Sequence, residues 1–288
     1  MSLITGLLLF LSIALSSGRN ILSKNISDFS YGTKKFYIAQ AIIFISGSFV
    51  LLISGADLSK ISPITVLYAI IYGLLLLAAQ WCYTVALKGG KTAVCSTVYS
   101  LGFIFPTLSG SIFWNEKITL FNMIGILMVI PAIIVSGMKS SESKMETAGY
   151  IIPLIVAMLS SGGLGIMQKV QQFSQFPEQK GVFVLIAFAF SGIVSLLFAL
   201  FAKNDFQNIS SKKYIAASGT GICFATCNLL NTTLAGRLSC AVFFPLLNIG
   251  SILLSLILGL IIYREKLTKK DFVVLGLGVV SILLINLK

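Results

Sequence analysis

Residues 113–119 read FWNEKIT, and residues 262–268 read IYREKLT. Each phrase closes one long apolar run and is followed by another. Glu116 and Glu265 are 265 − 116 = 149 residues apart, about half of the 288-residue chain. The repeated phrase therefore predicts that the chain consists of two related halves.

The composition is that of a membrane protein, with 57% hydrophobic residues, 10% charged residues and a mean hydropathy of +0.98. A helix that crosses a hydrocarbon layer of about 30 Å needs roughly 20 mostly apolar residues. The sequence supplies such runs at 2–23, 33–54, 62–87, 92–114, 119–137, 148–169, 182–202, 213–235, 239–263 and 269–287. We therefore expect an all-α integral membrane protein with ten transmembrane helices.

The similarity between the halves extends beyond the opening phrase. Residues 14–24 read ALSSGRNILSK and residues 158–169 read MLSSGGLGIMQK, so the first and sixth predicted helices share a Ser-Ser-Gly motif. The predicted division is a first five-helix repeat over 1–138, a linker over 139–147 and a second five-helix repeat over 148–288. Because each repeat has an odd number of helices, the second enters the membrane in the opposite sense, an arrangement typical of secondary transporters.

The fourth and ninth predicted helices both end in aromatic-x-Glu-Lys-x-Thr, and Pro106 lies ten residues ahead of Glu116. On these features the chain resembles the EamA-like branch of the drug/metabolite transporter superfamily. The resemblance implies a ten-helix transporter of the cell membrane with two inverted halves and both termini inside. In two respects the chain departs from the pattern. Pro245 lies twenty residues before Glu265, and the first helix lacks the Glu that small multidrug exporters use for proton–drug exchange.

Polar side chains within the apolar runs are costly in lipid, so they are expected to face the interior of the bundle. Small Ser, Thr and Gly residues are explained well enough by close helix packing. Large amides need several hydrogen-bond partners, and they favour a central cavity between the first, third, fourth, sixth, eighth and ninth helices. The predicted substrate-binding residues are Arg19, Asn20, Gln80, Tyr83, Tyr99, Gln168, Asn228, Asn231 and Asn248.

Two interpretations of Arg19 remain open at this point. Its guanidinium can hold a carboxylate or phosphate through two hydrogen bonds. It can equally reach the membrane surface as an anchor, because it lies near the end of its predicted helix. Gln168 invites the same two interpretations. Tyr83 and Tyr99 are candidates for stacking on a flat substrate or surrounding a cationic one, and aromatics also occur at lipid interfaces.

The sequence gives little support for an enzyme, for a metal or cofactor site, or for a nucleic-acid-binding protein. The chain has no histidine, its five cysteines lie within apolar runs, and its nine acidic residues lie in loops or near helix ends. The Gly-Gly-Lys-Thr stretch at 89–92 has Val85 where a phosphate-binding loop needs its first glycine. We expect no enzyme activity, no cofactor, no metal and no nucleic-acid partner, although the formal charge is +12.

The basic residues and the resemblance give opposite orientations. Six basic residues lie on the side of the termini and fifteen on the side of the linker. The positive-inside rule then places the linker in the cytoplasm, whereas the resemblance places the termini there.

The sequence thus predicts a secondary transporter that moves a small polar organic metabolite by alternating access. The substrate is expected to be amino-acid-like or another small zwitterionic or organic compound. The lipid bilayer and a coupling ion or counter-substrate are the other expected partners. The alternative is a lipid-handling protein, such as a flippase of a lipid-linked intermediate, which would need a polar groove open to the headgroups.

Overall fold

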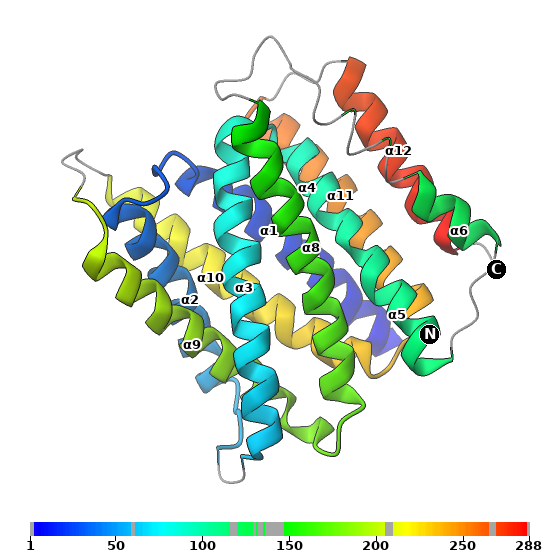
Figure 1. The fold of residues 1–288 in the computed structure, drawn as a ribbon, viewed down its shortest axis with the longest axis horizontal. Helices are drawn as coiled ribbons and strands as arrows, with labels where there is room; N and C mark the ends of the chain where they lie inside the picture. Colours follow the sequence, from blue (N-terminus) through cyan, green and yellow to red (C-terminus); the bar gives the residue numbers. More distant parts are fainter. Residues whose placement is uncertain are drawn as a thin grey trace.

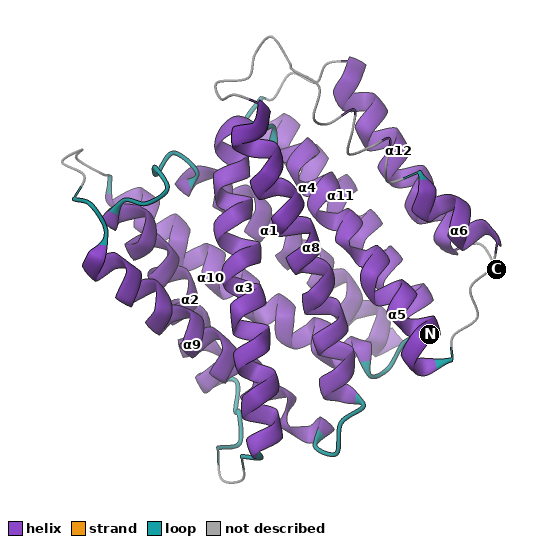
Figure 2. Cartoon of the chain, viewed as in Figure 1, coloured by secondary structure: helices purple, strands orange, loops and turns teal. Residues whose placement is uncertain are grey.

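The computed structural model describes residues 3–58, 61–115, 120–128, 131, 135, 147–204, 210–264 and 269–286. These residues form helices joined by short loops, and none of them belongs to a named strand (Figure 2). The first half contains α1 (Leu3–Ile26), α2 (Lys34–Ile53), α3 (Pro63–Gly89), α4 (Thr92–Ser100), the 3₁₀ turn η1 (Leu101–Phe103), α5 (Ile104–Trp114) and α6 (Leu120–Leu127).

The second half follows the same order (Figure 1). It contains α8 (Thr147–Gln172), the 3₁₀ turn η2 (Pro177–Gln179), α9 (Lys180–Phe201), α10 (Ser211–Ala235), α11 (Cys240–Ile262) and α12 (Lys269–Asn286). In both halves these bounds lie within three residues of the predicted apolar runs, except at 119–137. In that run α6 covers the first part, and most of the remaining residues lie outside the described part of the chain. Residues 116–119 and 265–268, the ends of the two repeated phrases, also lie outside the described part. The number of transmembrane helices therefore stays a prediction.

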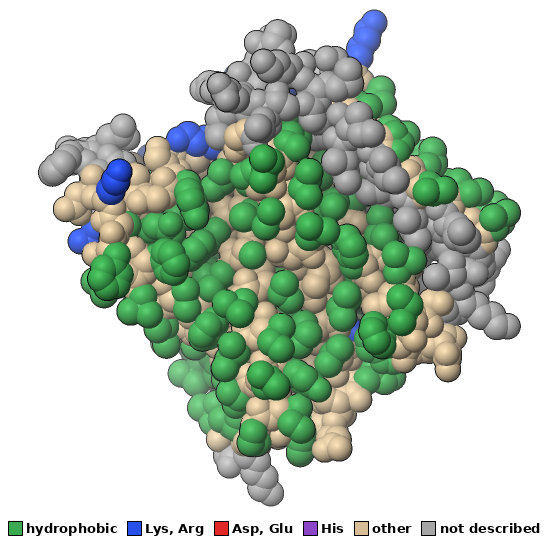
Figure 3. Space-filling view, viewed as in Figure 1, with side chains coloured by type: hydrophobic (Ala, Val, Ile, Leu, Met, Phe, Trp, Pro, Cys, Tyr) green, Lys and Arg blue, Asp and Glu red, His purple; other side chains and the backbone are tan. Residues whose placement is uncertain are grey.

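Five segments are long and apolar enough to cross a membrane: α1, α2, α3, Gly149–Gln172 of α8, and Pro177–Phe201 of η2 and α9. The 25-residue α10 does not reach that hydropathy because it carries polar residues such as Asn228, Asn231 and Thr232. It packs against α1 and α2 within the bundle. Large hydrophobic side chains cover the face seen in Figure 3, with Lys and Arg near its edges. This distribution is typical of a surface that faces lipid.

The main helix contacts pair elements of one half with elements of the other. Helix α1 packs on α10, and α8 packs on α3. Helix α2 packs on α9 and on α10, α3 packs on α9, and α6 packs on α12. In order along the chain, α8, α9, α10 and α12 correspond to α1, α2, α3 and α6. The contact of α1 with α10 therefore corresponds to that of α8 with α3, and the contact of α2 with α10 to that of α9 with α3. The contacts of α2 with α9 and of α6 with α12 each join two corresponding helices.

Glycines permit two of these equivalent contacts. A Cβ at Gly73 of α3 would lie 3.0 Å from the carbonyl oxygen of Ala187 in α9. A Cβ at Gly221 of α10 would overlap the carbonyl oxygen of Ile43 in α2. Small residues let helix backbones approach closely, which is how membrane helices associate.

The ends of α5 and α11 also correspond. Asn115, which follows α5, has φ 52°, and Arg264, just beyond the end of α11, has φ 50°. Among the described residues, these two are the non-glycine residues with positive φ. They are 264 − 115 = 149 residues apart, the offset of the repeated phrase. The described start of each phrase therefore has the same left-handed backbone turn.

Candidate substrate-binding cavity

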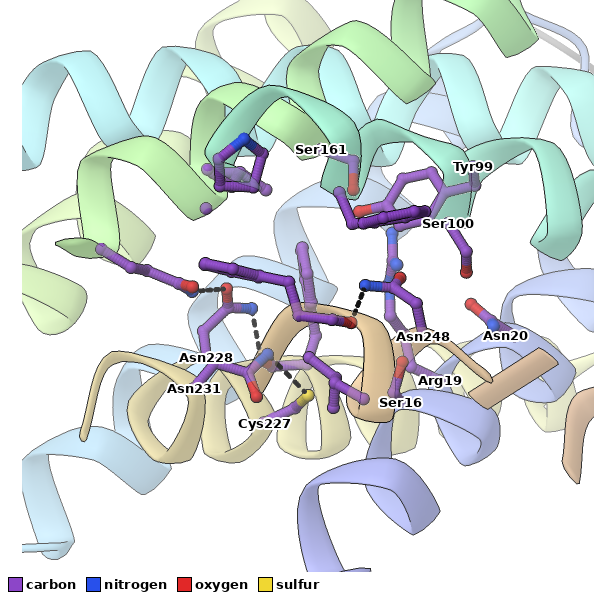
Figure 4. Close-up of a pocket in the computed structure, with 18 residues that line it drawn as sticks. Ser16, Arg19, Asn20, Tyr99, Ser100, Ser161, Cys227, Asn228, Asn231 and Asn248 are labelled. Carbon is purple, nitrogen blue, oxygen red and sulfur yellow. Dashed lines mark hydrogen bonds between the residues drawn. The ribbon is translucent and has the colours of Figure 1, made fainter. Parts of the chain in front are cut away.

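A cavity of about 80 Å³ lies between helices of the two halves of the chain (Figure 4). Its wall is built by α1, α4, η1, α5, α8, α10 and α11. The polar lining consists of Ser16, Arg19, Asn20, Tyr99, Ser100, Ser161, Gln168, Cys227, Asn228, Asn231 and Asn248. The rest of the lining is Phe103, Pro106, Leu164, Gly165, Phe224, Phe244 and Leu247. Such a mixture of apolar walls and a few convergent polar groups is typical of small-molecule sites.

Arg19 is the cationic residue of this lining, and its side chain is only 3% exposed. Its Nε and Nη2 donate to the same oxygen, Oε1 of Gln80, at 3.1 and 2.7 Å. Such burial does not fit an anchor that reaches the membrane surface, so the structure favours the interpretation in which the guanidinium belongs to the cavity.

Aromatic rings surround the guanidinium. Its Cζ lies 4.2 Å from the ring centre of Phe224, 4.9 Å from that of Tyr99 and 5.1 Å from that of Tyr83. Rings at this distance attract a cation through their quadrupole, although they do not neutralise it. In the described part of the chain no carboxylate pairs with Arg19, and the ion pair found there joins Lys213 to Asp28 at the surface.

Gln80 and Tyr83 do not line the cavity, and they contact Arg19 from α3. The Nε2 of Gln80 donates to the hydroxyls of Ser23, at 3.4 Å, and Thr84, at 3.2 Å. Because those hydroxyls accept from the nitrogen, the amide oxygen is held toward Arg19. These two predicted binding residues are thus placed one layer behind the cavity wall.

A second group of hydrogen-bonded polar side chains, beside the cavity, joins three helices. Gln168 of α8 donates through Nε2 to the hydroxyl of Tyr72, at 2.7 Å, and to Oδ1 of Asn228, at 3.2 Å. The Tyr72 hydroxyl donates to the same Oδ1 at 2.5 Å. Sequence reasoning did not select Tyr72, although its position two helical turns before Gln80 places both on one face of α3.

The remaining amides lie at other points of the wall (Figure 4). Asn231 accepts a hydrogen bond from the hydroxyl of Ser12, and Asn248 donates to the carbonyl of Phe244 at 2.6 Å. Asn20 donates through Nδ2 to the hydroxyl of Ser255 at 3.1 Å. Its Oδ1 is buried and accepts from no described group. Seven of the predicted residues thus border one cavity: Arg19, Asn20, Tyr99, Gln168, Asn228, Asn231 and Asn248.

The wall formed by α4, η1 and α5 is irregular where it borders the cavity. Pro106 has no backbone N–H, so the hydrogen bond that a helix would make to the carbonyl of residue 102 is missing. The chain takes 3₁₀ form over Leu101–Phe103, and Phe103 and Pro106 both face the cavity. Tyr99 and Ser100 precede this turn and border the cavity with it.

Residues 148–287 match the model of the EamA-like transporter family. This half of the chain belongs to the EamA-like transporter family. The resemblance to the drug/metabolite transporter superfamily is therefore confirmed over these residues, and it indicates a multi-pass membrane transporter.

A solved crystal structure, described as "Crystal structure of protein", matches the chain with a TM-score of 0.66. The match covers 99% of this chain and 96% of the other, at 14% sequence identity. At that identity the match shows a shared fold and nothing about a shared substrate. Among curated protein sequences no match was found.

Proposed function

We propose that the protein is a secondary transporter that moves a small polar organic metabolite, either amino-acid-like or another small zwitterionic or organic compound, by alternating access. The observation that carries this proposal is the buried guanidinium of Arg19 at a cavity bordered by amides and hydroxyls. A transporter site needs groups that replace the hydration of its substrate, and those groups are here held in place by the surrounding helices.

The donors of Arg19 divide into two sets. Nε and Nη2 hold Gln80, whereas Nη1 makes no hydrogen bond to a described residue. Arg19 borders the cavity, so a substrate carboxylate can accept from its remaining N–H groups. The unpaired Oδ1 of Asn20 offers an acceptor for a hydroxyl or amino group of the same substrate. Together these groups suit a compound with an acidic end and a hydrogen-bond donor.

The proposed movement follows from the architecture. We take the chain as ten spans in two inverted repeats, over 1–138 and 148–288. The matching helix contacts of the two halves and the left-handed turns at Asn115 and Arg264 support this arrangement. Inverted repeats of secondary transporters rock about a site near the bilayer midplane, where their broken helices meet. The 3₁₀ turn ahead of Pro106 is such an interruption beside the cavity.

The position of the polar groups also favours this proposal over a lipid flippase. A flippase needs a polar groove that continues to the headgroup region between two helices. Here the large amides and Arg19 lie around a central cavity, and large hydrophobic side chains cover much of the outer surface.

Reconstitution in liposomes tests the proposal. We expect saturable uptake of at least one member of a broad panel of radiolabelled polar metabolites. Arg19→Ala should weaken the apparent affinity for a carboxylate-bearing substrate roughly tenfold to a hundredfold, because a hydrogen bond to a charged group contributes about 1.5–3 kcal/mol. Folded yield, measured by size-exclusion chromatography, should stay the same.

Lys169→Ala is the matched control. Lys169 is also 3% exposed and lies near the rings of Trp114 and Phe173, but it does not border the cavity. Its removal should leave the affinity of a correctly folded protein unchanged. Absence of saturable transport for the whole panel would contradict the proposed function.

A further inference from the structure

We infer that the substrate provides the counter-ion that Arg19 lacks, and that the protein is an exchanger of small organic monoanions such as hydroxylated carboxylates. This inference rests on the proposed transport function and names the substrate charge and the mode of transport.

Arg19 sets the charge of the cavity when no substrate is bound. Arg19 is cationic and buried, and its described neighbours are the neutral Gln80 and the rings of Tyr83, Tyr99 and Phe224. None of the described residues that line the cavity is acidic. A buried charge without an ion of opposite sign is strongly unfavourable, even where hydrogen bonds satisfy part of it. The empty site therefore carries one positive charge that an anion would neutralise.

The charge of the cavity also distinguishes between classes of substrate. A monoanion on Arg19 makes the occupied cavity neutral. A zwitterion leaves the cavity with its positive charge and adds an ammonium group that has no carboxylate in the lining. A hydroxyl next to the carboxylate, by contrast, can donate to the buried Oδ1 of Asn20 without any further charge. The lining thus favours a hydroxylated carboxylate over an amino acid of the same shape.

The buried charge also affects the movement between the two open states. Alternating access passes through a state in which the site is closed to both sides and water is largely excluded. In that state the empty protein would enclose an uncompensated guanidinium, whereas the loaded protein encloses a neutral pair. A ligand shifts a conformational equilibrium by its differential affinity for the two states, so a monoanion should stabilise the closed state selectively. Movement without substrate is then slow, and net transport requires a second anion for the return step.

Binding is tested with L-lactate, L-lactamide and L-alanine, which have nearly the same shape and differ in charge. We expect L-lactate to raise the unfolding temperature of the purified full-length protein. It should bind at least about tenfold more tightly than L-lactamide, because charge-assisted hydrogen bonds are about twice as strong as neutral ones. It should also bind at least about tenfold more tightly than L-alanine, because the ammonium group of L-alanine would be buried without a carboxylate partner. Equal stabilisation by L-alanine, stabilisation by none of the three, or equal stabilisation by sodium chloride would overturn the inference.

Transport is tested with the same probe in proteoliposomes. Uptake of radiolabelled L-lactate should be several times faster into vesicles loaded with unlabelled L-lactate than into empty vesicles. Equal rates in the two kinds of vesicle would overturn the inference. They would leave the proposed transport function standing, since that function fails only when no metabolite is transported.

Two variants at the Arg19–Gln80 contact separate charge from shape. Gln80→Glu places a carboxylate on Arg19 within the protein, so L-lactate should lose its stabilising effect. Arg19→Gln removes the charge, so the preference for L-lactate over L-lactamide should disappear. Lys169→Gln serves as the control, because it removes an equally buried cation away from the cavity and should preserve the preference. Retention of the full preference in folded Arg19→Gln would overturn the inference.

Discussion

At the scale of single residues, the function proposed here depends on how neutral groups orient one charged group. Gln80 accepts twice from Arg19 with one oxygen and donates with its nitrogen to the hydroxyls of Ser23 and Thr84. Hydrogen bonds that share members in a low-dielectric interior strengthen one another and hold those members in place. The guanidinium is thereby fixed without being neutralised, which leaves its charge available to a ligand.

The Tyr72 hydroxyl tests the other polar group of the cavity. It accepts from Gln168 and donates to Asn228, and Tyr72 is fully buried. Tyr72→Phe should lower the free energy of unfolding by about 1–3 kcal/mol, because it removes two hydrogen bonds and weakens the satisfaction of two amides. Thermal unfolding in detergent measures the loss. Tyr68→Phe, on the same helix at a half-buried position, is the control, and an equal change in both variants would contradict this prediction.

At the scale of elements, the close crossing of α10 and α2 depends on Gly221. A Cβ there would overlap a backbone carbonyl of α2, which cannot move aside as a flexible side chain can. Gly221→Ala should therefore destabilise the protein by about 1–3 kcal/mol or more, the usual cost of overpacking. Gly276→Ala in α12 has no heavy atom within 4 Å of the added Cβ. It should be neutral or slightly stabilising, by up to about 1 kcal/mol, since Ala favours helix over Gly. Thermal unfolding of the two variants measures this difference in stability, and an equal change in both would contradict the prediction.

The helices themselves could be predicted from the sequence because each is a continuous apolar run that ends at a polar loop. What surrounds each polar residue could not be predicted in the same way. Helical periodicity places Gln80 and Arg19 on faces of their own helices, and it does not tell which face meets which. As a result Gln80 and Tyr83 lie behind the cavity, although they were predicted to border it. The ring centre of Phe224 lies 4.2 Å from Cζ of Arg19. A phenylalanine within an apolar run gives no sign in the sequence that it contacts a buried cation.

At the scale of the whole molecule, the two halves share a scaffold and differ in the chemistry they bring to the cavity. The Ser-Ser-Gly motifs at 16–18 and 160–162 are followed by Arg19 in the first half and by Gly163 in the second. The cation of the described cavity lining therefore comes from the first half, while the second half contributes most of the amides. The similarity of the two halves suits the proposed rocking movement. The difference between Arg19 and Gly163 supplies the charge that is proposed to select the substrate.

The inverted arrangement predicts that the end of α5 and the end of α11 lie on opposite sides of the membrane. Asn115 and Arg264 occupy equivalent, exposed positions after α5 and after α11. In Figure 1, α5 ends at one edge of the molecule, and α12 begins at the opposite edge. If the halves are inverted, cysteines at these positions face opposite sides of the membrane.

Asn115→Cys and Arg264→Cys, made one at a time, allow this to be measured with a membrane-impermeant maleimide. We expect one variant to react in intact cells or right-side-out vesicles and the other only after the membrane is opened. The five native cysteines lie in the helices at buried or half-buried positions, so the unsubstituted protein should give a low background. Reaction of both variants from the same side would show that the halves run in parallel, and the rocking movement about the Arg19 cavity would then have to be abandoned. The side on which each variant reacts also decides between the orientation given by the basic residues and that implied by the family.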